Sequence, residues 1–252
     1  MTTAMSTPHE ITYSIYVYIS DAYDEKETAT KEDQKIPGLT YLSTDANDAA
    51  GLFEVYRYED GYVVIRVSGV GRYLIVPEGK AVPAPLENDI QVVQQPVSNI
   101  YVSDENLFET LAGIDGADLA PLMTMTGFEG AEGTKYTGAY DELDLAQLLR
   151  NKCGLAVLPG TCADHRVTGW AEDDPEAVTV SGLDDEKAAG LGKVFEALKG
   201  FGIPGFVDRS ADETTEQGAL EWLKLYGILL GCEDVMVQAY ETMAADLADA
   251  AA

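Results

Sequence analysis

The segment from Gly200 to Asp234 constrains the fold of this chain more than any other segment. It begins with the pattern of a buried strand at Ile203–Val207, continues through a polar turn, and ends in an apolar-rich helix at Leu220–Leu230. In open α/β sheets, ligands bind where a strand ends and the chain turns toward the next helix. The sequence therefore predicts an α/β fold with a ligand site at this turn.

Strand and helix patterns alternate from Ile90 onward, which is typical of a parallel or mixed α/β sheet. Upstream, Val63–Val67 and Tyr73–Val76 are β-branched runs joined by a glycine-containing turn of hairpin length. We expect a single three-layer α/β lobe. Its central sheet is mostly parallel and flanked by helices, a β-hairpin region precedes it, and a long helix ends it.

The same patterns divide the chain into three parts: an N-terminal extension (1–50), an α/β ligand-binding lobe (51–216) and C-terminal helices (217–252). The other predicted elements are strands at Ile11–Tyr18, Leu52–Tyr58, Ile90–Val93 and Leu155–Leu158, and helices at Asp104–Ala112 (N-capped by Ser103), Asp141–Lys152, Asp184–Gly200 and Glu233 to the C-terminus.

Charge excludes some classes of partner. The chain has 44 acidic and 16 basic residues, a formal net charge of −28. Nucleic acid is not expected as a partner, because its binding requires clustered Lys and Arg, and an anionic membrane surface would repel the chain. Two interpretations of the acidity stay open: attraction of a cationic ligand or basic partner, and a general solubility bias.

Metal, disulfide and membrane signals are weak. Three cysteines do not form a disulfide framework, and Cys162 with His165 is too sparse a set for zinc. There is no apolar run of about 20 residues, so we expect no transmembrane segment. The N-terminus lacks the pattern of a signal peptide, which leaves a cytoplasmic location, or an extracytoplasmic one after removal of a leader.

Binding residues are easier to find than catalytic ones. Ser210 has no His partner in reach, so nucleophilic catalysis is not expected, and an enzyme on this frame would depend on Asp208, Asp212 and Glu213. Tyr136 and Tyr140 offer flat aromatic contacts on a loop, or ordinary loop packing. Arg209 either pairs with an acid or holds an anionic ligand group.

Several short motifs follow one another in a definite order between residues 52 and 236. In this order and spacing, the chain resembles the solute-binding proteins of bacterial ABC importers, in the group that carries iron complexes, haem or vitamin B12. The motifs are Tyr58–Glu59–Asp60–Gly61–Tyr62, Tyr73–Leu74–Ile75–Val76–Pro77, Gln94–Gln95–Pro96–Val97–Ser98–Asn99–Ile100–Tyr101, Cys153–Gly154–Leu155–Ala156–Val157, Gly202–Ile203–Pro204, Asp208–Arg209–Ser210 and Glu221–Trp222–Leu223–Lys224–Leu225–Tyr226–Gly227.

The resemblance implies two α/β lobes joined by a long helix, with the ligand between them. Residues 52–216 match the first lobe, and the joining helix begins at Trp222. The implied function is extracytoplasmic capture of a chelated metal, haem or corrinoid, without a cofactor of the protein's own and without catalysis. The predicted ligand contacts are Tyr136, Tyr140, Arg209, Ser210, Asp212 and Glu213.

The resemblance also implies docking to an ABC permease. Relatives carry an acidic residue for this purpose where this chain has Ala146, and Glu142 and Asp144 lie close enough in sequence to replace it. The alternative is a divergent one-lobe relative that acts as an acidic protein-interaction module without a transport ligand.

Overall fold

The structure, a computed structural model, describes residues 34–162, 194–195 and 197–250. The predicted strand Ile11–Tyr18 and most of the predicted helix Asp184–Gly200 lie outside these residues, although residues 194–195 and 197–200 are helical. Within the described ranges, no helix combines the length and apolarity needed to cross a bilayer.

The first of two five-stranded sheets, sheet A, is mixed. Its strands follow sequence order: β1 (Tyr41–Thr44), β2 (Phe53–Tyr58), β3 (Val63–Val67), β4 (Gly71–Val76) and β5 (Ile90–Gln94). The pairs from β1 to β4 are antiparallel, which confirms the predicted hairpin of β3 and β4, while β5 runs parallel to β4.

The second sheet, sheet B, is entirely parallel. Its order is β10 (Gly205–Asp208), β9 (Leu155–Pro159), β6 (Ile100–Val102), β7 (Met125–Thr126) and β8 (Lys135–Tyr136). Every neighbouring pair in this sheet is parallel. The prediction of a mixed α/β fold with a parallel sheet is therefore confirmed.

One strand belongs to a different sheet from the one expected. We expected the parallel sheet to begin at Ile90, but β5 pairs with β4 and extends sheet A. Sheet B begins instead at β6, a three-residue strand that the sequence patterns did not predict. Three residues are too few to show a period, so their pairing is decided by tertiary contacts.

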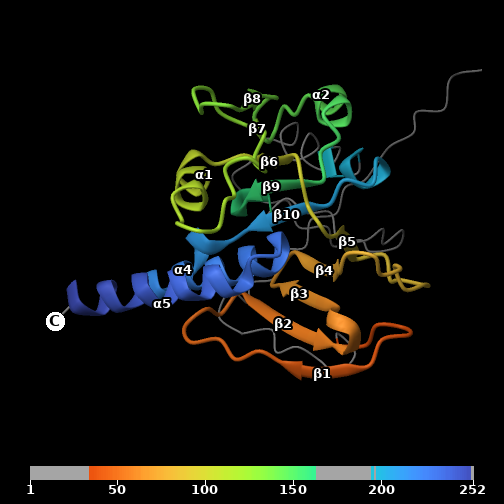
Figure 1. Cartoon of the computed structure of the whole chain (residues 1–252). Helices are drawn as coiled ribbons and strands as arrows, with labels where there is room; N and C mark the ends of the chain where they lie inside the picture. Colours follow the sequence, from red (N-terminus) through yellow and green to blue (C-terminus); the bar gives the residue numbers. More distant parts are fainter. Residues whose placement is uncertain (1–33, 163–193, 196, 251–252) are drawn as a thin grey trace, which may run out of the picture.

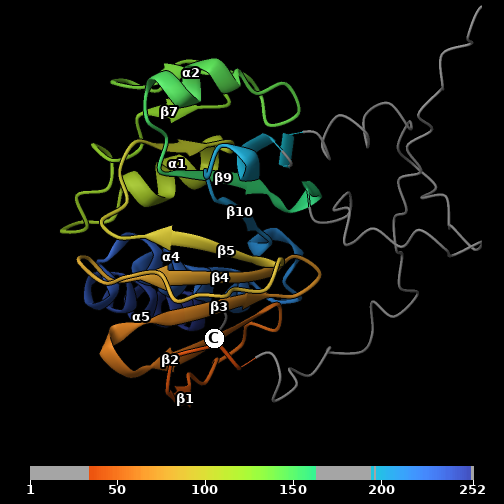
Figure 2. The same ribbon diagram turned by 90° about the vertical axis from the view of Figure 1, so that its right-hand side faces the viewer.

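Besides the helical residues up to 200, the described part of the chain has helices α1 (Glu105–Ala112), α2 (Leu145–Arg150), α4 (Glu216–Leu230) and α5 (Glu233–Ala250) beside the sheets. Single 3-10 turns lie at Glu59–Gly61, Gly160–Cys162 and Ser210–Asp212. Figures 1 and 2 show α4 and α5 side by side against one face of sheet A, with sheet B beyond β5.

Helix caps decide where the predicted helices begin. Asp104, and not Ser103, caps α1, because its carboxylate accepts the N–H of Leu107 at 2.8 Å. The helix predicted at Asp141–Lys152 is shorter, since Asp144 caps it and its residues before Leu145 are not helical. A side-chain oxygen that accepts a first-turn N–H is what starts a helix at these positions.

A single apolar core joins both sheets to α4. On sheet A its members alternate along the strands, for example Val63, Ile65 and Val67 on β3. Phe206 of β10 contacts Tyr73 of sheet A and Trp222 of α4, with ring centroids 5.0 and 6.3 Å apart. The opposite face of sheet A buries a smaller cluster that includes Ile36.

Side chains of sheet A also cover the outer edge of β10. The Gln91 amide bonds both backbone groups of Gly205, at 2.8 and 3.2 Å, as a neighbouring strand would. The Tyr73 hydroxyl donates to Gly205 and accepts from Val207. Sheet B is thereby fastened to sheet A and does not expose this edge.

Candidate functional site

The carboxyl edge of sheet B is the candidate site. All five strands end at this edge because they run in the same direction. From β6, the later strands β7 and β8 are added on one side, and β9 and β10 on the other. The order therefore reverses between β6 and β9, and in open α/β sheets such a switch point opens a crevice for ligands.

At the β10 end, the residues from Asp208 to Glu213 form the site turn. Asp208 is buried, and its carboxylate accepts the N–H of Ser210 at 2.7 Å and the hydroxyl of Tyr226. Burial raises the pKa of Asp208, while these two hydrogen bonds act in the opposite direction. The hydrogen bond from Tyr226 to Asp208 joins the carboxyl end of β10 to α4.

Arg209 is 7% exposed, and its guanidinium group bonds to other residues of the protein. Its Nε donates to Asp212 at 2.8 Å, and its Nη1 donates to the carbonyl of Ser68 in the β3–β4 turn at 2.7 Å. Of the two roles open to Arg209 in the sequence, the structure shows the ion pair with an acid. Asp212 and Ser210 remain partly accessible beside it.

Glu213 is engaged by the protein backbone. Its carboxylate accepts the N–H groups of Gly51 and Leu52 at 2.9 and 3.0 Å, and the indole N–H of Trp222 at 3.0 Å. These contacts join the site turn to α4 and to the segment that directly precedes β2. Glu213 thus has a structural role that the sequence did not indicate, because its backbone partners Gly51 and Leu52 are more than 160 residues away.

At the other end of the edge, Tyr136 ends β8 with 47% of its surface exposed. Tyr140 lies in the following turn, is half-buried and packs against the main core. The Tyr101 hydroxyl donates to the carbonyl of Gly138 at 3.0 Å and holds the loop between the two tyrosines. A side chain at Gly138 would overlap the backbone of Glu142, so this loop is tightly folded.

The predicted contacts therefore form two groups on one edge. Tyr136 and Tyr140 lie at β8, and Arg209, Ser210 and Asp212 lie at β10, with three strands between them. Four interstrand steps of ~4.8 Å place the two groups about 19 Å apart. A ligand that touches both groups has to span this distance.

The two proposed docking acids differ in their surroundings. Glu142 is exposed. Asp144 is the N-cap of α2, where it accepts the backbone N–H of Gln147 at 2.9 Å and its side-chain amide at 2.7 Å. These hydrogen bonds lower the pKa of Asp144. Asp144 therefore has a local role in α2 as well as an acidic charge.

Sequence reasoning missed the residues at the switch point itself. Ser103 follows β6, and its hydroxyl oxygen is buried without a hydrogen-bond partner. Asp104 follows it and lies close enough to contribute to the raised pKa of Asp208. No local signal could have found them, because the switch point exists only once β6 and β9 are known to be neighbours.

The thiols offer no reactive group at this edge. Cys162 is buried just beyond β9, and burial raises its pKa to about 12, so the thiol stays protonated at neutral pH. Burial likewise raises the pKa of Cys153 to about 11. Among the residues that the structure describes, no group of three or more His, Cys, Asp and Glu side chains could hold a metal ion.

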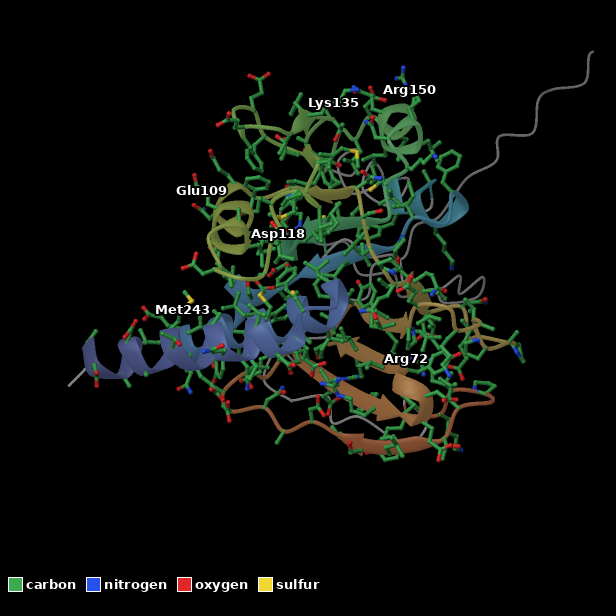
Figure 3. All side chains as sticks on the ribbon, in the orientation of Figure 1. Arg72, Glu109, Asp118, Lys135, Arg150 and Met243 are labelled. Atoms are coloured by element: carbon green, nitrogen blue, oxygen red, sulfur yellow. The ribbon has the colours of Figure 1, made fainter. Side chains whose placement is uncertain are left out.

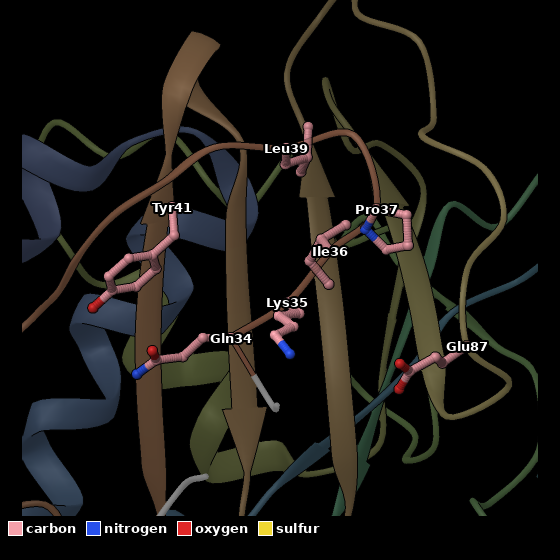
Figure 4. Close-up of a pocket in the computed structure, with 7 residues that line it drawn as sticks. All are labelled: Gln34, Lys35, Ile36, Pro37, Leu39, Tyr41 and Glu87. Atoms are coloured by element: carbon pink, nitrogen blue, oxygen red, sulfur yellow. The ribbon is translucent and has the colours of Figure 1, made fainter. Parts of the chain in front are cut away.

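A separate pocket of about 420 Å³ lies away from this edge, on the outer face of sheet A. Figure 4 shows Tyr41, Lys35 and Glu87 around it, beneath the chain segment that includes Ile36 and Leu39. None of the predicted ligand contacts lines this pocket. Glu87 is also an ion-pair partner of the buried Arg72.

Comparisons with family models, with curated proteins and with solved structures found no match to this chain.

Proposed function

We propose that the chain is the extracytoplasmic solute-binding component of an ABC importer and captures a chelated metal, haem or a corrinoid. In this proposal, sheet B with its helices is the three-layer ligand-binding lobe, and α4 begins the joining helix. The chain binds its ligand without catalysis and docks on a permease through Glu142 and Asp144.

One observation carries the proposal: the aromatic and polar residues predicted as ligand contacts gather along the carboxyl edge of an all-parallel sheet that has a switch point. Tyr136 at one end is exposed, and Ser210 and Asp212 at the other end are accessible. The separation of about 19 Å favours a large planar ligand over a small metabolite.

A ligand screen tests this function. We expect haemin, cyanocobalamin or a ferric siderophore to raise the melting temperature and to change its own absorption spectrum on binding. Tyr136→Ala should weaken that binding about tenfold, because an exposed aromatic anchor is lost. Tyr41→Ala is the matched control, since Tyr41 is also exposed but belongs to β1 of sheet A. A protein that responds to none of the three ligands would contradict the proposal.

The charge of α5 favours a second candidate, an acidic interaction module. The helix carries Glu233, Asp234, Glu241, Asp246 and Asp249, and no Lys or Arg follows Lys224 in the chain. Figure 3 shows Lys135 and Arg150 at the top of the molecule, away from Met243 of α5. Arg57 pairs with Glu233, and the other four acids give α5 a negative charge that suits a basic partner surface.

Salt dependence tests the second candidate. We expect a basic protein such as lysozyme to bind the chain in dilute buffer and to be released near 0.5 M NaCl, because exposed charges are screened over a few ångströms there. A variant with Glu241, Asp246 and Asp249 changed to Asn or Gln should bind several-fold more weakly. Association that neither salt nor this variant changes would exclude the acidic helix as the contact surface.

A further inference from the structure

The chain between β1 and β2 contains a segment, Asp48–Leu52 (the strap), whose five consecutive backbone N–H groups point at two carboxylates. Glu221 of α4 accepts the first three at 2.7, 2.8 and 2.8 Å. Glu213 of the site turn accepts the last two at 2.9 and 3.0 Å. Successive N–H groups form a concavity that binds anions, and here carboxylates of the same chain fill it.

The α4 end of this arrangement is fully enclosed. Glu221 is 0% exposed, and its charge is stabilised by the N–H groups of the strap and by Lys224, whose Nζ lies 3.0 Å away. Lys224 also bonds the side chain of Asp48 at 2.8 Å, and Tyr240 of α5 donates to the same carboxylate. Figure 1 shows the chain between β1 and β2 bending from sheet A toward these helices.

The other end of the arrangement belongs to the candidate site. Glu213 closes the site turn, with its own N–H donating to Ser210 at 3.2 Å, and Trp222 holds its carboxylate from α4. Three residues earlier in the chain, Ser210 is bonded to Asp208, and Arg209 reaches Ser68. A displacement of Glu213 would therefore change the site turn and the strap together.

We infer that the strap and the site turn form one cooperative unit, in which Glu213 and Glu221 are positioning residues. Loss of either carboxylate leaves the other to hold a segment that needs both, because the five N–H groups are contiguous. A change that destabilises the site turn then also destabilises the strap, and the reverse. Such a shared change in stability is the physical basis of coupling between two places in a protein. The coupling between the strap and the site turn does not depend on the proposed function. The further step, that a ligand bound at the carboxyl edge acts on this unit, rests on the proposed function.

Amide hydrogen exchange on the full chain tests the coupling without a ligand. In Glu221→Gln we expect exchange to accelerate about tenfold at residues 48–50, because one of the two acceptor oxygens becomes an NH2 donor and the negative charge is lost. We also expect severalfold acceleration at residues 51–52 and at 210–213, which Glu221 does not touch. Acceleration confined to residues 48–50 would overturn the inference.

Two further variants keep the test decisive. Glu216→Gln, an exposed first-turn acid of α4, should leave exchange in both segments unchanged. If Glu221→Gln does not fold, Glu213→Gln reports from the opposite end, because Glu213 is only half-buried. It should accelerate residues 48–50, which it does not contact, and no change there would also overturn the inference.

A ligand arm separates this inference from the proposed function. Haemin or cyanocobalamin, whichever binds, should slow exchange at the strap severalfold in the unmodified chain and have little effect there in Glu213→Gln. Binding that leaves the strap unchanged would contradict the coupling to the site. Failure of both compounds and of a ferric siderophore to bind would count against the proposed function alone, since the exchange of the ligand-free variants still decides the coupling.

Discussion

Trp222→Ala should lower the free energy of unfolding by about 3–5 kcal/mol. Trp222 is 1% exposed and lies at the junction of both sheets and α4, with its ring centroid 5.4 Å from that of Phe53 and 6.3 Å from that of Phe206. Removal of the indole leaves a cavity that backbone strands on two sides cannot collapse to fill. Urea denaturation followed by far-UV circular dichroism measures the loss.

Trp222→Phe is the matched control for this prediction. It keeps an aromatic ring in the core but removes the indole N–H that Glu213 accepts at 3.0 Å. The expected loss is about 1.5–3 kcal/mol, the effect of one hydrogen bond to a charged group. A Trp222→Ala loss below about 1 kcal/mol would show that the two sheets and α4 do not share the core described above.

Glu221→Ala should cost about 3–5 kcal/mol, because a buried charge partner is removed and neighbouring polar groups lose their acceptor. Three backbone N–H groups of the strap and the ammonium of Lys224 all depend on this carboxylate. Glu216→Ala, which changes an exposed acid of the same helix, should stay within about 0.5 kcal/mol. Equal effects of the two substitutions would mean that the strap contributes no stability.

The same carboxylate gives a defined pH dependence. Burial would raise the pKa of Glu221, but the three backbone N–H bonds and Lys224 outweigh burial, so the pKa lies below its ordinary value. A carboxyl group with a lowered folded pKa stabilises the fold above its unfolded pKa, about 4.3 for Glu, and loses that contribution as the pH falls. The stability difference between the unmodified chain and Glu221→Gln should therefore be full at pH 7 and shrink below about pH 4. A difference that does not change with pH would contradict the lowered pKa.

Local patterns were sufficient for most of the described elements. β3 has the predicted bounds, and the bounds of β2, β4, β9 and β10 lie within two residues of the predicted ones. These strands were found because β-branched runs between turn residues are typical of buried strands. Helix α4 begins at Glu216 and not at Leu220, since Thr215 caps it and accepts the N–H of Gly218. β1 was missed because all four of its residues are exposed and carry no apolar period.

The candidate site was predicted only in part. The site turn was found because an acid and an arginine follow a buried strand, which is a local signal. The switch point between β6 and β9 was not found, because strand order is a property of the sheet and not of any strand. The roles of Glu213 in the site turn and Glu221 in α4 were not found either, since the sequence around an acidic residue looks the same whether it faces a ligand, solvent or the backbone.

By itself, the sequence determined that this chain is a mixed α/β protein with a polar turn after Ile203–Val207 and two tyrosines around Gly138, although Tyr136 ends strand β8 and does not lie on a loop. These features depend on side-chain period, turn residues and caps, which act over a few residues. The tertiary structure alone decided that the turn and the two tyrosines share one sheet edge, and that Glu213 and Glu221 hold the strap. The contacts of the strap join segments more than 160 residues apart, and their energy comes from burial and from hydrogen bonds that exist only after the chain has folded.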